Sequence, residues 1–346
     1  MVESSRRPVT LAKHSLAPSL RARPKPDGLP KIVVIGGGTG SFNVLTGLKA
    51  YPCSLTAVVA MTDSGGSSGR LRDEFGHLPP GDVRRCLLAL SPDDHAGMVL
   101  RQLFDYRFNR GNGLDGHSFG NLFLTALTEV TGSTEAAIQE MGRLLGIKGQ
   151  VLPVTLTNTN LFARLRNGVI IEGETNIDRR TVHPDVPIDY VYLQPKAFVS
   201  PGTAKAIEEA DAIVIGPGDL YTSILANLAV EGVAHAIVQS RGKRIYVCNI
   251  MTKPGESDGF KASDFIREIN TYLGVEGKLD CALVNTQSLE ERVVQRYAAE
   301  HAAPVAFDSA ACDALAAKVV GAPLASVGNF VRHDPHRLAD AILKLL

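Results

Sequence analysis

The sequence predicts a three-layer α/β fold with a Rossmann-like, mostly parallel sheet and an inserted β-hairpin. Short apolar runs rich in Val and Ile alternate with helix-like stretches from Lys31 to the C-terminus. Such runs are typical of strands buried on both faces, and their alternation with helices favours a parallel sheet covered on each side. The exception is segment 161–177, where Asn167-Gly168 separates two strand-like runs. This dipeptide favours a tight hairpin turn.

Each expected strand is a short run dominated by β-branched or aliphatic residues. In chain order, these runs are KIVVI, SLTAVVAM, QVLPVTL, VYLQP, DAIVIG, KRIYVCNIM and DCALVN. Helices are expected between them, where apolar residues recur at helical spacing. The expected helices cover residues 42–50, 82–90, 97–105, 121–129, 134–145, 202–209, 223–230, 262–273 and 289–299.

Composition excludes several classes of protein. The 346 residues are 45% apolar, and 36 Lys and Arg balance 36 Asp and Glu, so we expect neither a nucleic-acid partner nor an anionic membrane. No apolar run reaches the roughly 18 residues of a membrane span, and we expect a soluble protein. The five cysteines include no C-x-x-C pair, which argues against a disulfide framework or a zinc site and favours reduced core thiols.

The chain divides into a tail and one domain. Residues 1–29 carry six Lys or Arg, two acidic residues and several prolines, with no apolar segment of signal-peptide type. We therefore predict a disordered basic tail over 1–29, followed by a single α/β domain over 30–346.

The first glycine loop, VIGGGTGS, follows a strand and opens a helix. Its glycines let a phosphate approach the backbone while free amide N–H groups and the positive helix end point at it. The fit to G-x-G-x-x-G is imperfect because Ser41 occupies the third glycine position, so a plain tight turn stays open as an alternative. The candidate ligand-binding residues here are Gly37, Gly38, Thr39, Gly40 and Ser41.

A second loop follows the next strand. Asp63 stands 27 positions after Gly36, where a nicotinamide dehydrogenase would place an acid on the ribose. However, Gly66, Ser67 and Ser68 follow, and then Arg70, and small residues with a guanidinium suit a polyphosphate or another oxyanion. A mobile surface loop with solvated charges is the alternative.

The stretch Gly116-His117-Ser118-Phe119-Gly120 matches the G-x-S-x-G nucleophile elbow. An elbow needs a strand directly before it, and the preceding YRFNRGNGLD is loop-like, so a hydrolase is disfavoured. We instead expect Ser118 or Asn121 to cap a buried helix. His117 and Ser118 would then line the cleft that the glycine loops face.

Two later strand ends supply further polar candidates. These are Gly216, Gly218, Asp219, Tyr221 and Thr222 after one strand, and Asn249, Thr252, Lys253 and Glu256 after the next. Ligands of open α/β sheets bind at the carboxyl ends of strands, so we expect all these loops to converge on one crevice. Asp219 would repel a phosphate unless it bound a cation or a sugar hydroxyl, and its role stays open.

Six motifs occur in order along the chain: GGGTGSFNVLTGLK, TDSGGSSGRLRDEFGHLPPGDVRRCLLAL, GHSFGNLFLTALTE, GQVLPVT, GPGDLYTSILANLAV and CNIMTKPGESDGF. Together they resemble the YvcK family of bacterial gluconeogenesis and cell-shape factors. These proteins are relatives of CofD, the 2-phospho-L-lactate transferase. The resemblance runs from about Lys31 to the C-terminus.

This resemblance implies a cytosolic, dimeric protein with a Rossmann-like fold that binds nucleotide sugars such as UDP-N-acetylglucosamine. It further implies a function in growth and morphogenesis on gluconeogenic carbon sources, with Tyr297 and Arg332 as ligand contacts. The CofD relatives imply an alternative, the Mg²⁺-dependent transfer of a phospho-linked group from a nucleoside diphosphate ester to an alcohol.

An enzyme of that alternative kind would use Asp63 as a metal ligand, Arg70 as a charge clamp and His117 as a base. The chain departs from the family here, because many members carry paired aspartates where this sequence reads Asp63-Ser64. The sequence therefore leaves open whether any reaction is catalysed. No cofactor is certain, and Mg²⁺ is the candidate.

Overall fold

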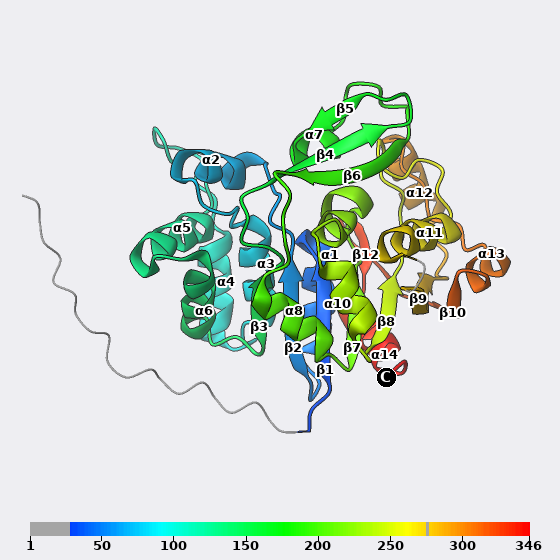
Figure 1. The fold of residues 1–346 in the computed structure, drawn as a ribbon, viewed down its shortest axis with the longest axis horizontal. Coiled ribbons are helices and arrows are strands. Elements are labelled where there is room, and N and C mark those ends of the chain that lie inside the picture. Colours follow the sequence, from blue (N-terminus) through cyan, green and yellow to red (C-terminus); the bar gives the residue numbers. More distant parts are fainter. Residues whose placement is uncertain (1–27, 275–276) are drawn as a thin grey trace, which may run out of the picture.

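The computed structural model describes residues 28–274 and 277–346, and its centre is a seven-stranded parallel sheet (Figure 1). Most of the predicted tail lies outside the described residues. In spatial order the strands are β10 (Ala316–Ala322), β9 (Leu279–Asn285), β8 (Lys243–Val247), β7 (Ala212–Ile215), β1 (Lys31–Gly36), β2 (Ser54–Val59) and β3 (Gln150–Pro153). The predicted three-layer α/β fold is confirmed.

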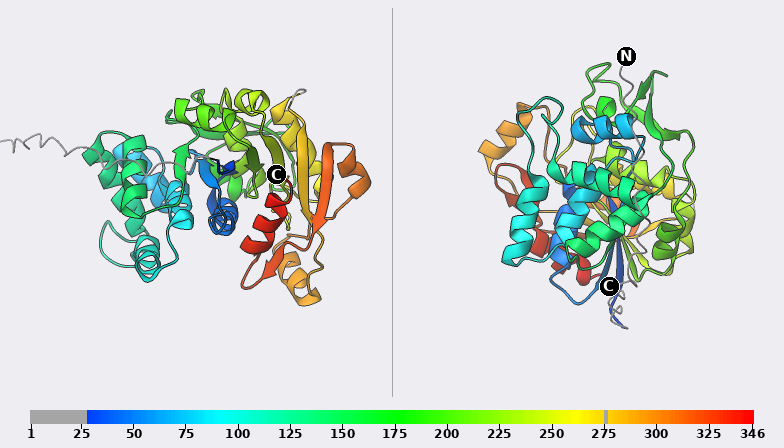
Figure 2. Two further views of the ribbon diagram at one scale, coloured as in Figure 1. Left: turned by 90° about the horizontal axis from the view of Figure 1, so that it is seen from below. Right: turned by 90° about the vertical axis from the view of Figure 1, so that its left-hand side faces the viewer.

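Helices cover both faces of this sheet, as the view from below shows (Figure 2). On one face α1 (Gly38–Leu48) packs against α3 (Gly81–Leu90) and α14 (Pro335–Leu343). On the other face α10 (Val233–Gln239) packs against α8 (Pro201–Glu208) and α11 (Ala262–Leu273). The remaining helices are α2 (Gly66–Phe75), α4 (His95–Asp105), α5 (Phe119–Thr131), α6 (Thr134–Leu144), α9 (Ala226–Leu228), α12 (Glu291–Ala298) and α13 (Ser309–Asp313).

The core follows from the continuous apolar strands. Ile32 and Val34 of β1 point to one face of the sheet and Ile35 points to the other. All three are 0% exposed, because helices cover both sides of the strand. Chain order reverses at β1, which lies between β2 and β7. Such a switch point opens a crevice at the carboxyl ends of the strands.

The predicted hairpin is part of a larger insertion over that crevice. Strand β4 (Asn160–Leu165) pairs antiparallel with β5 (Ile170–Glu172), and Gly168 in the turn has φ +87°. The sequence did not reveal that β6 (Ile188–Gln194) completes a three-stranded sheet with α7 (Glu174–Asp178) beside it. In Figure 1 this insertion covers the top of the central sheet.

The α-helix expected over residues 223–230 begins as a π-helix, which has a wider turn. Residues Leu220–Leu225 form a π-helix, η1, in which the Ile224 amide bonds the Asp219 carbonyl at 3.0 Å. A short antiparallel pair, β11 (Ala325–Val327) and β12 (Val331–His333), lies beside α1.

All five cysteines are unpaired, and four of them are buried. Across the residues that the structure describes, no helix combines the length and apolar character of a membrane span.

Candidate functional site

A large cavity, which we call the main cleft, lies at the carboxyl ends of β1, β2 and β7. It has a volume of about 620 Å³, and α7 of the insertion forms part of its wall. Its lining residues are Gly37, Gly38, Thr39, Gly40, Ala60, Thr62, Asp63, Gly65, Gly66, Ser67, Ser68, Gly81, Asp82, Arg84, Arg85, Arg107, Asn121, Glu174, Thr175, Asp178, Arg179, Gly218, Asp219, Thr222 and Ser223.

A smaller cavity of about 270 Å³, which we call the side hollow, adjoins it. The residues that line it are Thr39, Gly40, Asn43, Pro217, Gly218, Asp219, Asn249, Ile250, Met251, Tyr297, Phe330, Val331, Arg332 and His333. The two cavities share Thr39, Gly40, Gly218 and Asp219, which we call the shared wall. The predicted loops thus meet at one end of the sheet, but in two adjoining cavities rather than in one crevice.

The shared wall requires glycine. A Cβ on Gly40 would lie 1.9 Å from the carbonyl oxygen of Pro217, a clash with rigid backbone. The start of α1 therefore lies directly against the loop after β7. Gly37 is less constrained, because a Cβ there would lie 2.4 Å from Oδ2 of Asp82, the end of a side chain that can move.

Asp82 is a cleft residue that the sequence did not single out. It lies in the first turn of α3, and its carboxylate accepts a hydrogen bond from the Gly38 amide at the start of α1. Burial and the nearby charge of Asp63 raise the pKa of Asp82 to about 7. A carboxyl group therefore already occupies an amide that a ligand phosphate would use.

Asp63 lies near a second carboxyl group with a raised pKa, that of Glu174. Oδ1 of Asp63 accepts from the Gly65 amide at 2.9 Å. Burial and the charge of Asp63 also raise the pKa of Glu174, at the start of α7, to about 7. No local pattern in the sequence indicated that Glu174 lies here, since it comes from the insertion. Carboxylate oxygens are ligands that Mg²⁺ prefers, and Asp63, Asp82 and Glu174 line one cleft. Among the described residues, the acids whose oxygens all lie within 4.8 Å of one another are, however, Asp178, Asp219 and Glu256.

Basic side chains contribute to the lining of the same cleft. Arg84 is only 5% exposed, and its Nε donates to Oδ1 of Asn121 at 3.0 Å. Arg85 donates from Nη1 to Oγ1 of Thr39 at 3.0 Å. Arg107 and Arg179 are exposed and also line the cleft. Carboxylates and guanidinium groups together suit a ligand that carries phosphate and hydroxyl groups.

A hydrogen-bond network supports the start of α2. Nδ2 of Asn121 donates to Oγ of Ser67 at 3.2 Å and to Oγ of Ser68 at 3.4 Å. Ser118 caps α5 by accepting from the Asn121 amide, as predicted. His117 lies behind Ser67, with Nδ1 3.0 Å from its hydroxyl, and is not among the residues that line the cleft. Burial, and then Arg70, lower the pKa of the His117 imidazole.

Several predicted residues lie outside both cavity linings. Arg70 is exposed, and its Nη2 donates to the backbone oxygen of Asp115 at 2.7 Å instead of facing the cleft. Its expected position as a charge clamp is therefore corrected. Apart from His117, the other predicted residues outside the two linings are Ser41, Ser118, Gly216, Tyr221, Thr252, Lys253 and Glu256, all of which are buried except Lys253, which is half-buried.

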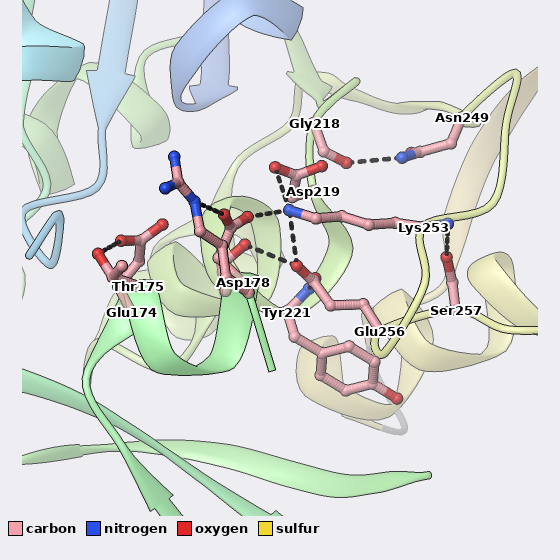
Figure 3. Close-up of polar contacts among 12 residues, drawn as sticks. Glu174, Thr175, Asp178, Gly218, Asp219, Tyr221, Asn249, Lys253, Glu256 and Ser257 are labelled. Atoms are coloured by element: carbon pink, nitrogen blue, oxygen red, sulfur yellow. Dashed lines mark hydrogen bonds and ion pairs between the residues drawn. The ribbon is translucent and has the colours of Figure 1, made fainter. Parts of the chain in front are cut away.

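A buried ammonium group lies beside the shared wall (Figure 3). Nζ of Lys253 pairs with Asp178, with Oδ2 of Asp219 at 2.8 Å and with Oε1 of Glu256 at 3.0 Å. Glu256, only 4% exposed, also accepts from the Tyr221 amide and the Thr222 hydroxyl, each at 3.0 Å. Lys253 thus connects α7 to the loops after β7 and β8.

The side hollow combines aromatic, basic and amide groups. The Tyr297 hydroxyl accepts from the Val331 amide at 2.8 Å. Phe330 is 61% exposed, and the guanidinium of Arg332 lies 5.4 Å from the centre of its ring. Nδ2 of Asn249 donates to the Gly218 carbonyl at 2.8 Å, whereas its buried Oδ1 has no partner among the described residues.

Comparisons with known proteins match most of the chain. Residues 32–325 match the family model described as 2-phospho-L-lactate transferase CofD. The chain is 48% identical over 320 residues to a protein of Nostoc sp., covering 91% of this chain and 68% of that relative. It is 40% identical over 319 residues to the gluconeogenesis factor of Bacillus subtilis, covering 92% of this chain and 98% of that relative.

A solved structure shares this architecture. The crystal structure of protein BH3568 from Bacillus halodurans superposes with a TM-score of 0.86 at 41% sequence identity, covering 91% of this chain and 99% of that one. A second crystal structure of BH3568, described as a member of the UPF0052 family, gives the same values.

Proposed function

This chain belongs to the CofD family, among its gluconeogenesis factors, and from that premise we propose that it binds a nucleotide sugar across the shared wall. The ligand class is that of UDP-N-acetylglucosamine. The observation that carries the proposal is the pair of cavities, one partly aromatic and the other polar, that meet at the glycine-rich start of α1.

The side hollow is suited to the nucleoside. Tyr297 and Phe330 offer ring faces against which a base can stack. Oδ1 of Asn249 is a buried acceptor without a partner among the described residues, and a base N–H or a ribose hydroxyl would satisfy it. Arg332 on the same hollow provides a guanidinium for the diphosphate.

The diphosphate would lie at the shared wall. Helix α1 has 11 residues, its N-cap Gly37 makes no side-chain hydrogen bond, and its first turn has no acid. Its amide N–H groups and positive end therefore favour an anion. The Asp82 carboxylate competes for the Gly38 amide. A phosphate would bind there with a cation that bridges it to the carboxylate, or with a proton on Asp82.

The sugar would then extend into the main cleft. Asp219, Thr222 and Ser223 line the cleft beside the wall and can bond sugar hydroxyls. This arrangement assigns Asp219 to a sugar hydroxyl instead of to the phosphate. We further propose that this binding takes place in the cytoplasm, in a homodimer, and that it supports growth and morphogenesis on gluconeogenic carbon sources. Of these, only the link to gluconeogenesis is supported by the name of a relative.

One observation favours the alternative, a Mg²⁺-dependent transferase of CofD type. Asp63, Asp82 and Glu174 lie close enough for the charge of Asp63 to raise the pKa of the other two. These carboxylates would hold Mg²⁺, which would neutralise charge on a transferring phosphoryl group. His117 could act as a base only through Ser67, and Arg85 replaces Arg70 as the guanidinium near the wall.

Two measurements on the full chain distinguish these functions. A binding screen is expected to select UDP-N-acetylglucosamine over NADH, and preference for NADH would contradict the proposal. The protein should then be incubated with UDP-N-acetylglucosamine, Mg²⁺ and candidate alcohols. Release of UMP or of a transferred phosphoester would show that it is an enzyme. Binding without turnover is expected for a factor that only senses the ligand.

A further inference from the structure

Five buried polar residues line the part of the main cleft formed by β2, α2, α3 and α5. We call this group the serine end, and it consists of Thr62, Ser67, Ser68, Arg84 and Asn121. Their exposed fractions lie between 3% and 5%. All five line the main cleft, and none lines the side hollow.

The side chains of the serine end are held in fixed orientations. Arg84 donates to Oδ1 of Asn121, so Nδ2 of this amide must face the two serines. The Arg84 guanidinium is itself held by the carboxylate of Asp105 and by the backbone oxygen of Phe104. Such preorganisation reduces the entropy that ligand binding would cost.

Hydrogen-bonding capacity at this end is incompletely used. Oγ1 of Thr62 is buried and has no partner within residues 28–274 and 277–346. A buried hydroxyl without a partner is destabilising, and a ligand that bonds it would recover that free energy. Helix α2 has ten residues, its N-cap Gly65 makes no side-chain hydrogen bond, and its first turn has no acid. Its first amides are therefore available to an acceptor.

The charges at this end favour an anion. The positive end of α2 and the Arg84 guanidinium lie here, and the exposed Arg107 lines the same cleft. Of the carboxylates around this end, Asp105 already pairs with Arg84, and Oδ1 of Asp63 already accepts from the Gly65 amide. Donors from a helix start, hydroxyls and a guanidinium are the groups that bind phosphate.

The rest of the cleft restricts what the phosphate can be attached to. Ala60 is the sole apolar side chain in the lining, and the other lining residues are glycine, hydroxyl-bearing, amide or charged. A flat aromatic or aliphatic ligand would leave these groups unpaired. Thr175, Asp178 and Glu174 on the insertion can instead bond several hydroxyls.

We propose that the serine end binds the phosphate of a second ligand, a small phosphorylated polyol such as a hexose phosphate. This ligand binds while the nucleotide sugar occupies the side hollow, the shared wall and the part of the main cleft beside Thr222 and Ser223. The main cleft, at about 620 Å³, is more than twice the size of the side hollow, at about 270 Å³. The second site does not depend on the first, since no residue of the serine end lines the side hollow.

Calorimetry on the full chain tests this site with glucose 6-phosphate, inorganic phosphate and glucose as probes. Glucose 6-phosphate is expected to bind at least tenfold more tightly than inorganic phosphate, and glucose not to bind. Saturating UDP-N-acetylglucosamine should change the glucose 6-phosphate affinity by less than threefold. Displacement by the nucleotide sugar would mean that both use one subsite, and the proposal would be wrong. It would also be wrong if glucose 6-phosphate did not bind.

Variants locate the site. Thr62→Val removes the unpartnered hydroxyl at nearly constant volume, so it should lower glucose 6-phosphate affinity about tenfold while the melting temperature rises or stays the same. Ser68→Ala should act in the same direction. Thr46→Val is the matched control, because its buried Oγ1 also lacks a partner among the described residues and it lines neither cavity. Equal affinities in all three variants would overturn the assignment. Arg332→Ala should weaken UDP-N-acetylglucosamine alone, so failure of one site is distinguishable from failure of the other.

Discussion

Replacing Asp82 with Asn should stabilise the protein above neutral pH. The pKa of Asp82 is raised from 3.8 to about 7 by burial and by the charge of Asp63. The folded state thus holds this proton more tightly than the unfolded state. Stability from this group is complete below pH 3.8 and is lost as the pH rises to about 7. Asn is neutral at every pH, and its Oδ1 can still accept from the Gly38 amide.

The size of this effect follows from the pKa difference. At about 1.4 kcal/mol for each pKa unit, ionising Asp82 in the folded protein costs about 4 kcal/mol. Water in the main cleft screens part of this cost, so we expect Asp82→Asn to gain about 2 kcal/mol at pH 8. With an unfolding entropy of about 2.1 cal/mol/K per residue, that gain raises the melting temperature by roughly 3 °C.

Thermal unfolding at pH 4 and pH 8 measures this gain. The variant and the wild type should melt together at pH 4 and differ at pH 8. Asp73→Asn is the control, because the Asp73 side chain is 75% exposed, and it should change the melting temperature little at either pH. A variant that is less stable than the wild type at pH 8 would refute the argument. It would mean that the ionised carboxylate contributes more to stability through the Gly38 amide than it loses through burial and repulsion.

Three further predictions concern Lys253, Tyr297 and His117. Lys253→Met leaves three carboxylates, whose oxygens lie within 4.8 Å of one another, without their cation. It should cost about 3–5 kcal/mol in unfolding free energy, whereas Lys205→Met, in an exposed pair, should cost under about 1 kcal/mol in the same denaturant titration. Tyr297→Phe removes the acceptor of the Val331 amide but keeps the ring. It should weaken UDP-N-acetylglucosamine less than Tyr297→Ala does, and equal losses would exclude stacking. Burial and Arg70 lower the pKa of His117 in the free protein. A ligand phosphate that binds beside Ser67 should raise this pKa, so that binding of glucose 6-phosphate is accompanied by uptake of a proton by His117. The other charges that act on this imidazole are Glu74 and Arg107. Glucose 6-phosphate affinity should therefore rise as the pH falls from 8 to 6, an effect that His117→Asn should abolish in calorimetry at both pH values.

Much of the fold could be predicted because its signals are local. The β-branched runs marked buried parallel strands, and Asn167-Gly168 marked the hairpin between β4 and β5. Strand β6 was also predicted, from VYLQP, but its pairing with β4 was not. That pairing depends on contacts between distant segments, which no local pattern reports.

The candidate site was less predictable, for the same reason. The glycine loops were placed correctly because they follow strands. Asp82 reads as an ordinary acid in the first turn of a helix, and only the fold brings it against Gly38. Glu174 comes from the insertion, far along the chain. Arg70 was wrongly predicted to face the ligand. The direction of its side chain depends on where α2 begins, and α2 begins at Gly66.

The division into two cavities also escaped the sequence. It results from the contact of Gly40 with the backbone of Pro217, two residues 177 positions apart in the chain. Glycine at positions 40 and 218 indicated that some group approaches the backbone closely there. It did not indicate which group this is. The shared wall is therefore a finding of the structure.

Calorimetric titration of the wild type and Arg332→Ala with UDP-N-acetylglucosamine and UDP tests the central claim most directly. The account predicts one ligand per chain, tighter binding of the nucleotide sugar than of UDP, and at least a tenfold loss of both affinities in Arg332→Ala. Absence of binding to the wild type, or equal affinity in the variant, would contradict the claim.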